Sequence, residues 1–323
     1  MAAASSKLFQ ALFLLGFFAT AANAQLKVGY YAKSCPNAEA IVKKVMDQVM
    51  DVAPSLSGPL LRMHFHDCFV RGCDGSLLIN STKNNTAEKD SPPNFTLRGY
   101  GVIDRVKEAL EKECPGVVSC ADTLAIVARD VTVATKGMYW EVETGRRDGR
   151  VSILTDAFTL IPPSANISTL ISGFKARGLS VKDLVVLQGS HTIGISHCSS
   201  FTNRIYNFTG KGDVDPTLDS EYIPRLRSKC RSPADQTTVV EMDPGSFKTF
   251  DDGYFKLVAK RRALFQSDAA MLDNAETKAY VEKSVTAGST FLKDFGESMV
   301  KMGRIGVLTG RAGEIRKVCY KIN

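Results

Sequence analysis

Residues 60–69 read Leu-Leu-Arg-Met-His-Phe-His-Asp-Cys-Phe, and this short stretch holds His64 and His66, half of the 4 histidines of the chain. If the stretch is helical, Arg62 and His66 are i,i+4 neighbours on one face, and Phe65 adjoins them. An imidazole can take up and return a proton near neutral pH, and a guanidinium can stabilise negative charge on a leaving oxygen. Together these groups predict a site suited to heterolytic cleavage of an O–O bond.

The same segment allows two other interpretations. A surface helix with salt bridges would contain these charges without any catalytic role. Alternatively, His64, His66, Cys68 and Cys73 could form a Cys2His2 zinc site. An oxidising secretory route disfavours free thiolates and therefore zinc, but the segment taken alone leaves both alternatives open.

The first 24 residues have the pattern of a secretory signal. Lys7 supplies a positive charge, an apolar run follows from Leu8 to Ala22, and Ala22-Asn-Ala24 is a small-x-small cleavage pattern. The run is short for a membrane span, so an N-terminal anchor helix is the less favoured alternative. We therefore expect a signal peptide over residues 1–24 and a secreted mature chain that starts at Gln25.

Residues 25–323 contain no linker, charge block or internal repeat, which predicts a single domain. The formal net charge of +7 is spread over 323 residues, and the longest basic run is Lys260-Arg-Arg262. This pattern argues against nucleic-acid binding, and no second hydrophobic segment indicates a membrane protein. A solubilising role is the simplest explanation of the charge, and a loose attraction to an anionic matrix is the alternative.

The chain contains 8 cysteines. An even number behind a signal peptide predicts four disulfides, but spacing alone leaves about 105 pairings. Sequons for N-glycosylation agree with the same secretory route; they lie at Asn80, Asn84, Asn94, Asn166 and Asn207.

Hydrophobic periodicity predicts an all-α fold, or nearly so, with minor β structure. Helices are expected around Ile41–Val49 and Val106–Leu110 and over residues 120–135, 168–178, 180–188 and 289–302. Ser180 and Asp183 have the spacing of a capping box. Strand signals are few, and they lie at residues 140–144 and after Asp243.

Two long motifs carry a resemblance to a known family. Arg62-Met-His-Phe-His-Asp-Cys68, followed by Val70-Arg-Gly-Cys-Asp-Gly-Ser76, resembles the distal motif of the class III haem peroxidases, the secretory plant peroxidases. The segment from Asp183 to Gly194 resembles their proximal haem-ligand motif. The resemblance extends from Tyr30 to Cys319 and includes all the cysteines. It implies a haem peroxidase fold, with haem between a distal and a proximal lobe. The implied reaction reduces hydrogen peroxide and oxidises small, phenolic donors by one-electron steps.

On the distal side, the resemblance implies that His66 is the acid and base, and that Arg62 stabilises the developing charge beside the aromatic Phe65. Asn94 would accept the other ring N–H of His66, and Glu88 would link this relay to a calcium site. Because a glycan is incompatible with that buried hydrogen bond, we predict that the Asn94 sequon is unmodified.

On the proximal side, the resemblance implies that His191 binds the iron of one haem b and that Asp268 accepts its other N–H. Such a bond gives the ligand imidazolate character. Pro162 matches a proline at the haem edge, where donors bind. Arg204 is expected to serve packing or surface charge and not to contact donors.

The resemblance further implies two calcium ions, each held by hard oxygen ligands. The distal ion would bind Asp67, Val70, Gly72, Asp74 and Ser76. The proximal ion would bind Thr192, Asp243, Ser246, Thr249 and Asp251. The implied disulfides are Cys35–Cys114, Cys68–Cys73, Cys120–Cys319 and Cys198–Cys230.

Three positions depart from the family pattern. Ile193 stands where some relatives carry an aromatic residue, and Met242 where others carry Phe; both are expected to alter proximal packing. Gln188 stands where a small residue is common, and the sequence offers no functional explanation for it. With no long extension after Cys319, we expect an extracellular or cell-wall location. We also expect a monomer that has at most a loose association with cell-wall polysaccharide.

Overall fold

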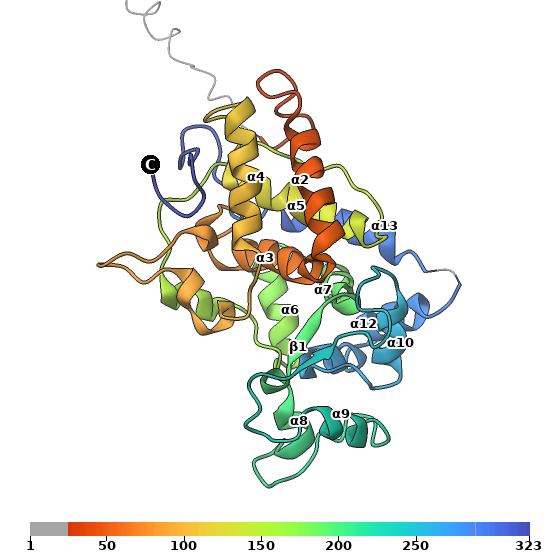
Figure 1. The fold of residues 1–323 in the computed structure, drawn as a ribbon. Coiled ribbons are helices and arrows are strands. Elements are labelled where there is room, and N and C mark those ends of the chain that lie inside the picture. Colours follow the sequence, from red (N-terminus) through yellow and green to blue (C-terminus); the bar gives the residue numbers. More distant parts are fainter. Residues whose placement is uncertain (1–24, 288) are drawn as a thin grey trace, which may run out of the picture.

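The structure is a computed structural model that describes residues 25–287 and 289–323, so the expected signal peptide lies outside the described residues. It is mostly helical, as predicted (Figure 1). In chain order the helices and strands are α2 (Ala38–Val52), α3 (Ser57–Val70), α4 (Tyr100–Glu113), α5 (Cys120–Ala134), α6 (Ile167–Lys175), α7 (Val181–Gln188), β1 (Ile195–His197), α8 (Thr202–Tyr206), α9 (Ile223–Lys229), β2 (Val239–Glu241), α10 (Gly253–Ala259), α11 (Gln266–Ala269), α12 (Ala275–Ser284) and α13 (Phe291–Met302).

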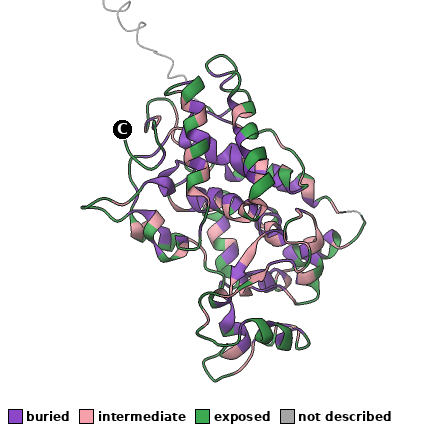
Figure 2. Ribbon diagram, viewed as in Figure 1, coloured by how far each residue is buried: buried purple, intermediate pink, exposed green. Residues whose placement is uncertain are grey.

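Helix α5 is the centre of the upper part of the molecule in Figure 1. Ser119 is its N-cap residue, and the Ser119 side chain accepts a hydrogen bond from the Asp122 amide at 3.0 Å. Nearly all of its residues are buried (Figure 2). Helices α2, α3 and α4 pack against it. This packing fixes α3, the helix that carries Arg62 and His66, across the middle of the molecule.

Helix α7 has the corresponding place in the lower part, where α6, α12 and α13 contact it. The predicted capping box is present, because the Asp183 amide donates to Ser180 Oγ at 3.1 Å and the Ser180 amide donates to Asp183 Oδ2 at 2.9 Å. The segment after α7 is a 3₁₀ turn, Gly189–Thr192, which carries His191.

The predicted strands were wrong. Residues 140–144 form no strand, and the segment contributes only an isolated bridge between Thr144 and Lys27. After Asp243 the chain makes turns, with the Ser246 amide bonded to the Asp243 carbonyl at 3.0 Å. The two strands of the described residues, β1 and β2, pair antiparallel elsewhere. An extended segment becomes a strand only where a partner lies beside it.

The upper and lower parts of the molecule are in close backbone contact at Gly58 and Gly194. A Cβ atom on Gly58, near the start of α3, would lie 2.9 Å from the Gly194 Cα. Gly194 also has φ +98°, a conformation that favours glycine. This contact brings the start of the Arg62–His66 helix against the loop that follows His191.

Four disulfides stabilise this arrangement, and they are the pairs that the resemblance implies: Cys35–Cys114, Cys68–Cys73, Cys120–Cys319 and Cys198–Cys230. The Cys68–Cys73 bridge closes the loop directly after α3. Among the described residues, no helix combines the length and the apolar character needed to span a membrane.

Candidate active site

Helix α3 brings Arg62 and His66 together as the i,i+4 spacing predicts. Arg62 Nε donates to His66 Nε2 at 2.9 Å. The other ring nitrogen, Nδ1, lies 2.6 Å from Asn94 Oδ1. Since an amide oxygen can only accept, Nδ1 carries the proton and Nε2 presents its lone pair. The two neighbours therefore fix one neutral tautomer of His66.

Electrostatics keep His66 neutral. Burial and the adjacent Arg62 guanidinium hold the pKa of His66 well below its usual range, although the hydrogen bond to Asn94 opposes this. An imidazole that is neutral at rest is ready to act as a base. Asn94 is itself fixed, because its Nδ2 donates to the Glu88 carbonyl at 2.6 Å.

Arg62 is held by partners that the sequence did not reveal. Its terminal nitrogens donate to Thr96 Oγ1 at 2.8 Å and to the Pro93 carbonyl at 2.9 Å. Among the described residues it forms no ion pair with a carboxylate, so α3 is not a salt-bridged surface helix. Phe65 is half-buried beside His66, with ring centroids 5.5 Å apart.

The zinc interpretation is wrong for this segment. Cys68 and Cys73 form a disulfide, so neither offers a thiolate. His64 lies on another side of α3, where its Nδ1 is 3.7 Å from Cys68 Sγ. It therefore does not share a site with His66.

His191 lies in the 3₁₀ turn after α7. Its Nδ1 is 2.9 Å from Oδ1 of Asp268, a fully buried residue of α11. Because the carboxylate holds Nδ1–H, the tautomer leaves Nε2 free to bind a metal. The rings of Phe265 and Tyr254 stand edge-on to the imidazole, with centroids at 5.3 and 6.0 Å.

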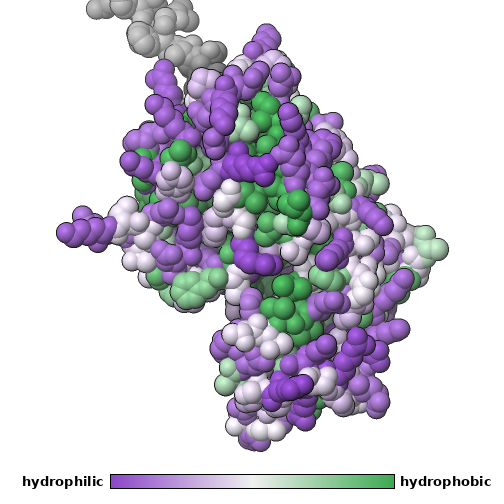
Figure 3. All heavy atoms as spheres, viewed as in Figure 1, coloured by the Kyte–Doolittle hydropathy of each residue, from purple (hydrophilic) through white to green (hydrophobic). Residues whose placement is uncertain are grey.

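These two histidines fit a haem group. One is a neutral base beside a cation, and the other is a carboxylate-supported ligand with a free nitrogen. On the face drawn in Figure 3, apolar residues gather in the middle of the molecule, between its upper and lower parts.

Pro162 is exposed, and its neighbour Pro163 accepts a hydrogen bond from the Ser267 amide, next to Asp268, at 2.9 Å.

Buried acids gather beyond α3. Burial and the carboxylates of Asp74 and Glu88 raise the pKa of Asp67 well above its usual range. Burial also raises the pKa of Glu88, to about 7. Both Glu88 carboxylate oxygens and Ser76 Oγ are buried without a hydrogen-bond partner. Unpaired hard oxygens and mutually repelling acids fit a cation of the calcium type. Val70 is the last residue of α3, and Gly72, with φ +99°, lies in the loop that follows it.

A second group of oxygens surrounds the residue after His191. Thr192 Oγ1 lies 3.4 Å from the Thr249 carbonyl and from Asp251 Oδ1, and Ser246 Oγ lies 3.3 Å from Asp251 Oδ2. Burial and the nearby Asp251 raise the pKa of Asp243 to about 6, and its buried Oδ2 has no partner. This group also fits calcium.

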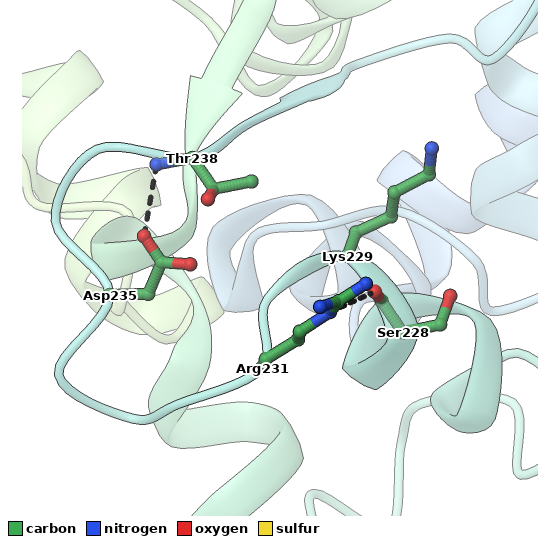
Figure 4. A pocket seen from close by; sticks show the side chains of 5 residues that line it. All are labelled: Ser228, Lys229, Arg231, Asp235 and Thr238. Carbon is green, nitrogen blue, oxygen red and sulfur yellow. Dashed lines mark hydrogen bonds between the residues drawn. The ribbon is translucent and has the colours of Figure 1, made fainter.

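A surface pocket lies apart from these groups, at the end of α9 (Figure 4). It is lined by polar and charged side chains, which are Ser228, Lys229, Arg231, Asp235 and Thr238. None of the residues discussed above contributes to it, so it is not part of the candidate active site.

The mostly helical fold and the two histidine sites fit a haem-dependent oxidoreductase. Residues 39–287 match the model of the family described as Peroxidase. The chain is 61% identical to Peroxidase 27 of Arabidopsis thaliana, with 100% of both chains covered. It is 62% identical to Peroxidase 56 of Arabidopsis thaliana, over 96% of this chain and 94% of the relative. It is 58% identical to Peroxidase 1 of Oryza sativa subsp. japonica, over 99% of this chain and 100% of the relative.

The chain therefore belongs to the peroxidase family, as a class III plant peroxidase. It is an oxidoreductase that reduces hydrogen peroxide, and the family implies haem as its cofactor and typically calcium as well.

Sequence reasoning missed several residues around the histidines. Tyr254 and Phe265 flank His191 from elements far along the chain, and no local pattern signals their proximity. Gln188 donates to Asp268 from the end of α7. Its unusual size for the family was the one available signal. Arg204 is fully buried against Asp215 at 2.6 Å, so it serves packing and not surface charge.

Proposed function

We propose that this protein is a secreted peroxidase that binds one haem b and two calcium ions and oxidises small phenolic donors by one-electron steps. The observation that carries the proposal is the neutral His66, whose Nε2 faces Arg62 and whose Nδ1–H is held by Asn94. A base, a cation and a fixed tautomer are the groups that peroxide cleavage needs.

On the distal side, His66 Nε2 takes the proton of the peroxide oxygen nearest the cofactor and returns it to the departing oxygen, which leaves as water. Arg62 stabilises the negative charge on that oxygen as the bond breaks. Asn94 prevents the ring from turning, because it holds Nδ1 at 2.6 Å. When bound, haem would supply the redox chemistry that accepts two oxidising equivalents from peroxide and passes them on singly.

On the proximal side, His191 would bind the iron through Nε2, and Asp268 would hold its Nδ1–H. The negative carboxylate increases electron donation from the imidazole, which favours oxidised states of the metal. Donors would approach at Pro162, since this proline is exposed on the loop bonded to Ser267.

The two calcium ions would bind the buried acid groups on either side of the haem. Asp67 follows His66 directly, and Thr192 follows His191, so each ion would support one histidine. The distal ligands would be Asp67, Val70, Gly72, Asp74 and Ser76, with Glu88 behind them. The proximal ligands would be Thr192, Asp243, Ser246, Thr249 and Asp251.

We further propose a monomer that is secreted to the cell wall. Four disulfides and the signal-like residues 1–24 support this route. Exposed cations such as Lys229 and Arg231 support a loose, salt-sensitive attraction to anionic wall polysaccharide. Retention on a pectate matrix at low salt, and release at high salt, would be the expected behaviour.

The proposed activity is tested by the visible spectrum of the purified protein before and after one equivalent of peroxide. We expect a Soret band that weakens and shifts, then recovers when a phenol is added. A Soret band that peroxide leaves unchanged would instead indicate a protein that binds haem without turnover. Absence of any Soret band in folded, haem-supplied protein would exclude haem binding.

A further inference from the structure

The Asp268 carboxylate accepts hydrogen bonds from three side chains, and His191 is only one of them. His191 Nδ1 lies 2.9 Å from Oδ1, and Gln188 Nε2 donates to the same oxygen at 3.2 Å. The Tyr254 hydroxyl donates to Oδ2 at 2.7 Å. Asp268 is fully buried, and no Lys or Arg among the described residues forms an ion pair with it.

We propose that Gln188 and Tyr254 are positioning residues that compete with His191 for the negative charge of Asp268. By sharing that charge they limit the imidazolate character of His191 and so raise the reduction potential of the iron. This inference rests on the proposed ligation of haem by His191. Gln188 and Tyr254 would touch neither the peroxide nor the cofactor, and they act only through Asp268.

The contacts of Gln188 favour this role over packing alone. Its only side-chain hydrogen bond among the described residues is the one to Asp268, and its buried Oε1 has no partner. Reversing the amide would place two acceptor oxygens against each other, so Nε2 is the atom that faces the carboxylate.

Tyr254 contributes from the other side of the same carboxylate. Its side chain is fully buried, and a phenol beside a carboxylate donates its proton to the hydrogen bond. Each donated bond draws charge toward the donor and weakens the carboxylate as an acceptor for the others. Because Gln188 shares Oδ1 with His191, its competition with the histidine is direct.

The sharing of the Asp268 charge gives the effect a definite direction. Removing either donor leaves more negative charge for His191, which strengthens the His191–Asp268 hydrogen bond and the donation to iron. The ferric–ferrous reduction potential should then become more negative, and the iron–histidine stretching frequency should rise. A variant that merely loosened the site would weaken the hydrogen bond and move both quantities in the opposite direction.

The experiment compares haem-loaded wild-type protein with Gln188→Leu and Tyr254→Phe, two changes that remove a donor while nearly conserving volume. The readouts are the reduction potential and the resonance Raman iron–histidine band. Tyr280→Phe is the matched control, because Tyr280 donates to the Asp294 carboxylate at 2.7 Å, a carboxylate that does not contact His191.

We expect a negative shift of the potential and a higher stretching frequency in both variants, and no change in the control. Unchanged or opposite shifts in the two variants, with a normal wild-type band, would overturn this inference and leave the proposed function intact. If one variant fails to fold, the other decides the matter alone. A wild-type protein that binds haem without an iron–histidine band would overturn the ligation itself and this inference with it.

Discussion

At the scale of single residues, His66 is the proton-transfer group that accepts a hydrogen bond from Arg62 Nε. We predict that His66→Ala retains haem, because His191 is unchanged. The reaction with peroxide should slow by about 10²- to 10⁴-fold. Stopped-flow measurement of the Soret change reports this rate. His197→Ala, which removes the histidine of β1, is the control and should react normally. A His66→Ala protein with wild-type kinetics would remove His66 from its proposed role.

The sequon at Asn94 gives a second prediction at this scale. Asn94 is buried, and its Nδ2, the atom that a glycan would modify, donates to the Glu88 carbonyl at 2.6 Å. We therefore expect active, secreted protein to be unmodified at Asn94. Peptide mass spectrometry before and after deglycosylation measures the occupancy of each sequon. Detection of a glycan on Asn94 in active protein would contradict the buried hydrogen bond of Asn94 Nδ2 to Glu88.

The residues of the site differ in how far the sequence predicted them. Arg62 and His66 lie one helical turn apart, so periodicity alone brought them together. Asn94 and Asp268 pair with histidines 28 and 77 residues away, and only the resemblance to a family pointed to them. Tyr254 was not predicted, because no local rule connects a residue of α10 to a carboxylate of α11.

At the scale of elements, the contact between α3 and the loop after His191 depends on Gly58. We predict that Gly58→Ala destabilises the protein by about 1–3 kcal/mol, because its Cβ would overlap the backbone at Gly194. Thermal unfolding measures the loss. Gly101→Ala on α4 is the control, since a Cβ there meets nothing within 4 Å. Equal melting temperatures for Gly58→Ala and wild type would show that the two segments can separate freely.

The acidic loop after β2 supports a prediction about calcium. In chelator, we expect Asp243→Asn to be at least as stable as wild type, because it removes a carboxylate beside Asp251 whose Oδ2 has no partner. With calcium at about 100 times its dissociation constant, wild type should gain about 2.7 kcal/mol from one site and the variant less. Melting temperatures with and without calcium test this. An equal calcium response in both proteins would exclude Asp243 as a ligand.

Most of the longer helices were predicted, whereas α8, α9, α10, α11 and α12 were missed and the predicted strands were wrong. Helical periodicity is local, so α5, α7 and α13 were found with errors only at their ends; α6, for example, ends at Lys175, before the turn to Gly178. Strand formation depends on a partner from elsewhere in the chain. Ile195–His197 pairs with Val239–Glu241, a segment distant in the sequence, whereas residues 140–144, in which Trp140 and Val142 alternate with glutamates, form only one isolated bridge.

At the scale of the whole molecule, His64 should make stability depend on pH. Burial and nearby Arg146 lower the pKa of His64 to about 3, from 6.5 in an unfolded chain. The imidazole is thus neutral in the folded protein, while the unfolded chain takes up a proton below pH 6.5. Its contribution to stability is complete above that pH and is lost progressively as pH falls toward 3.

We therefore predict that wild type loses roughly 2–3 kcal/mol more stability than His64→Leu between pH 7.5 and 4.5. Denaturant unfolding at the two pH values measures the difference, and the variant itself corrects for the other titrating groups. Parallel losses in the two proteins would show that His64 is not held neutral by the fold.

The disulfide between Cys120 and Cys319 has a sequence separation of 199, so it ties the central helix of the upper part to the end of the chain. The backbone between these residues, which includes His191 and Asp268, forms a covalent ring that the disulfide closes. A protease that cuts the backbone once within this ring opens it but releases no fragment, because the disulfide still joins the two polypeptide segments. In an environment rich in hydrolases and poor in reductants, a nicked molecule would remain a single covalent unit, and its pieces would part only after reduction.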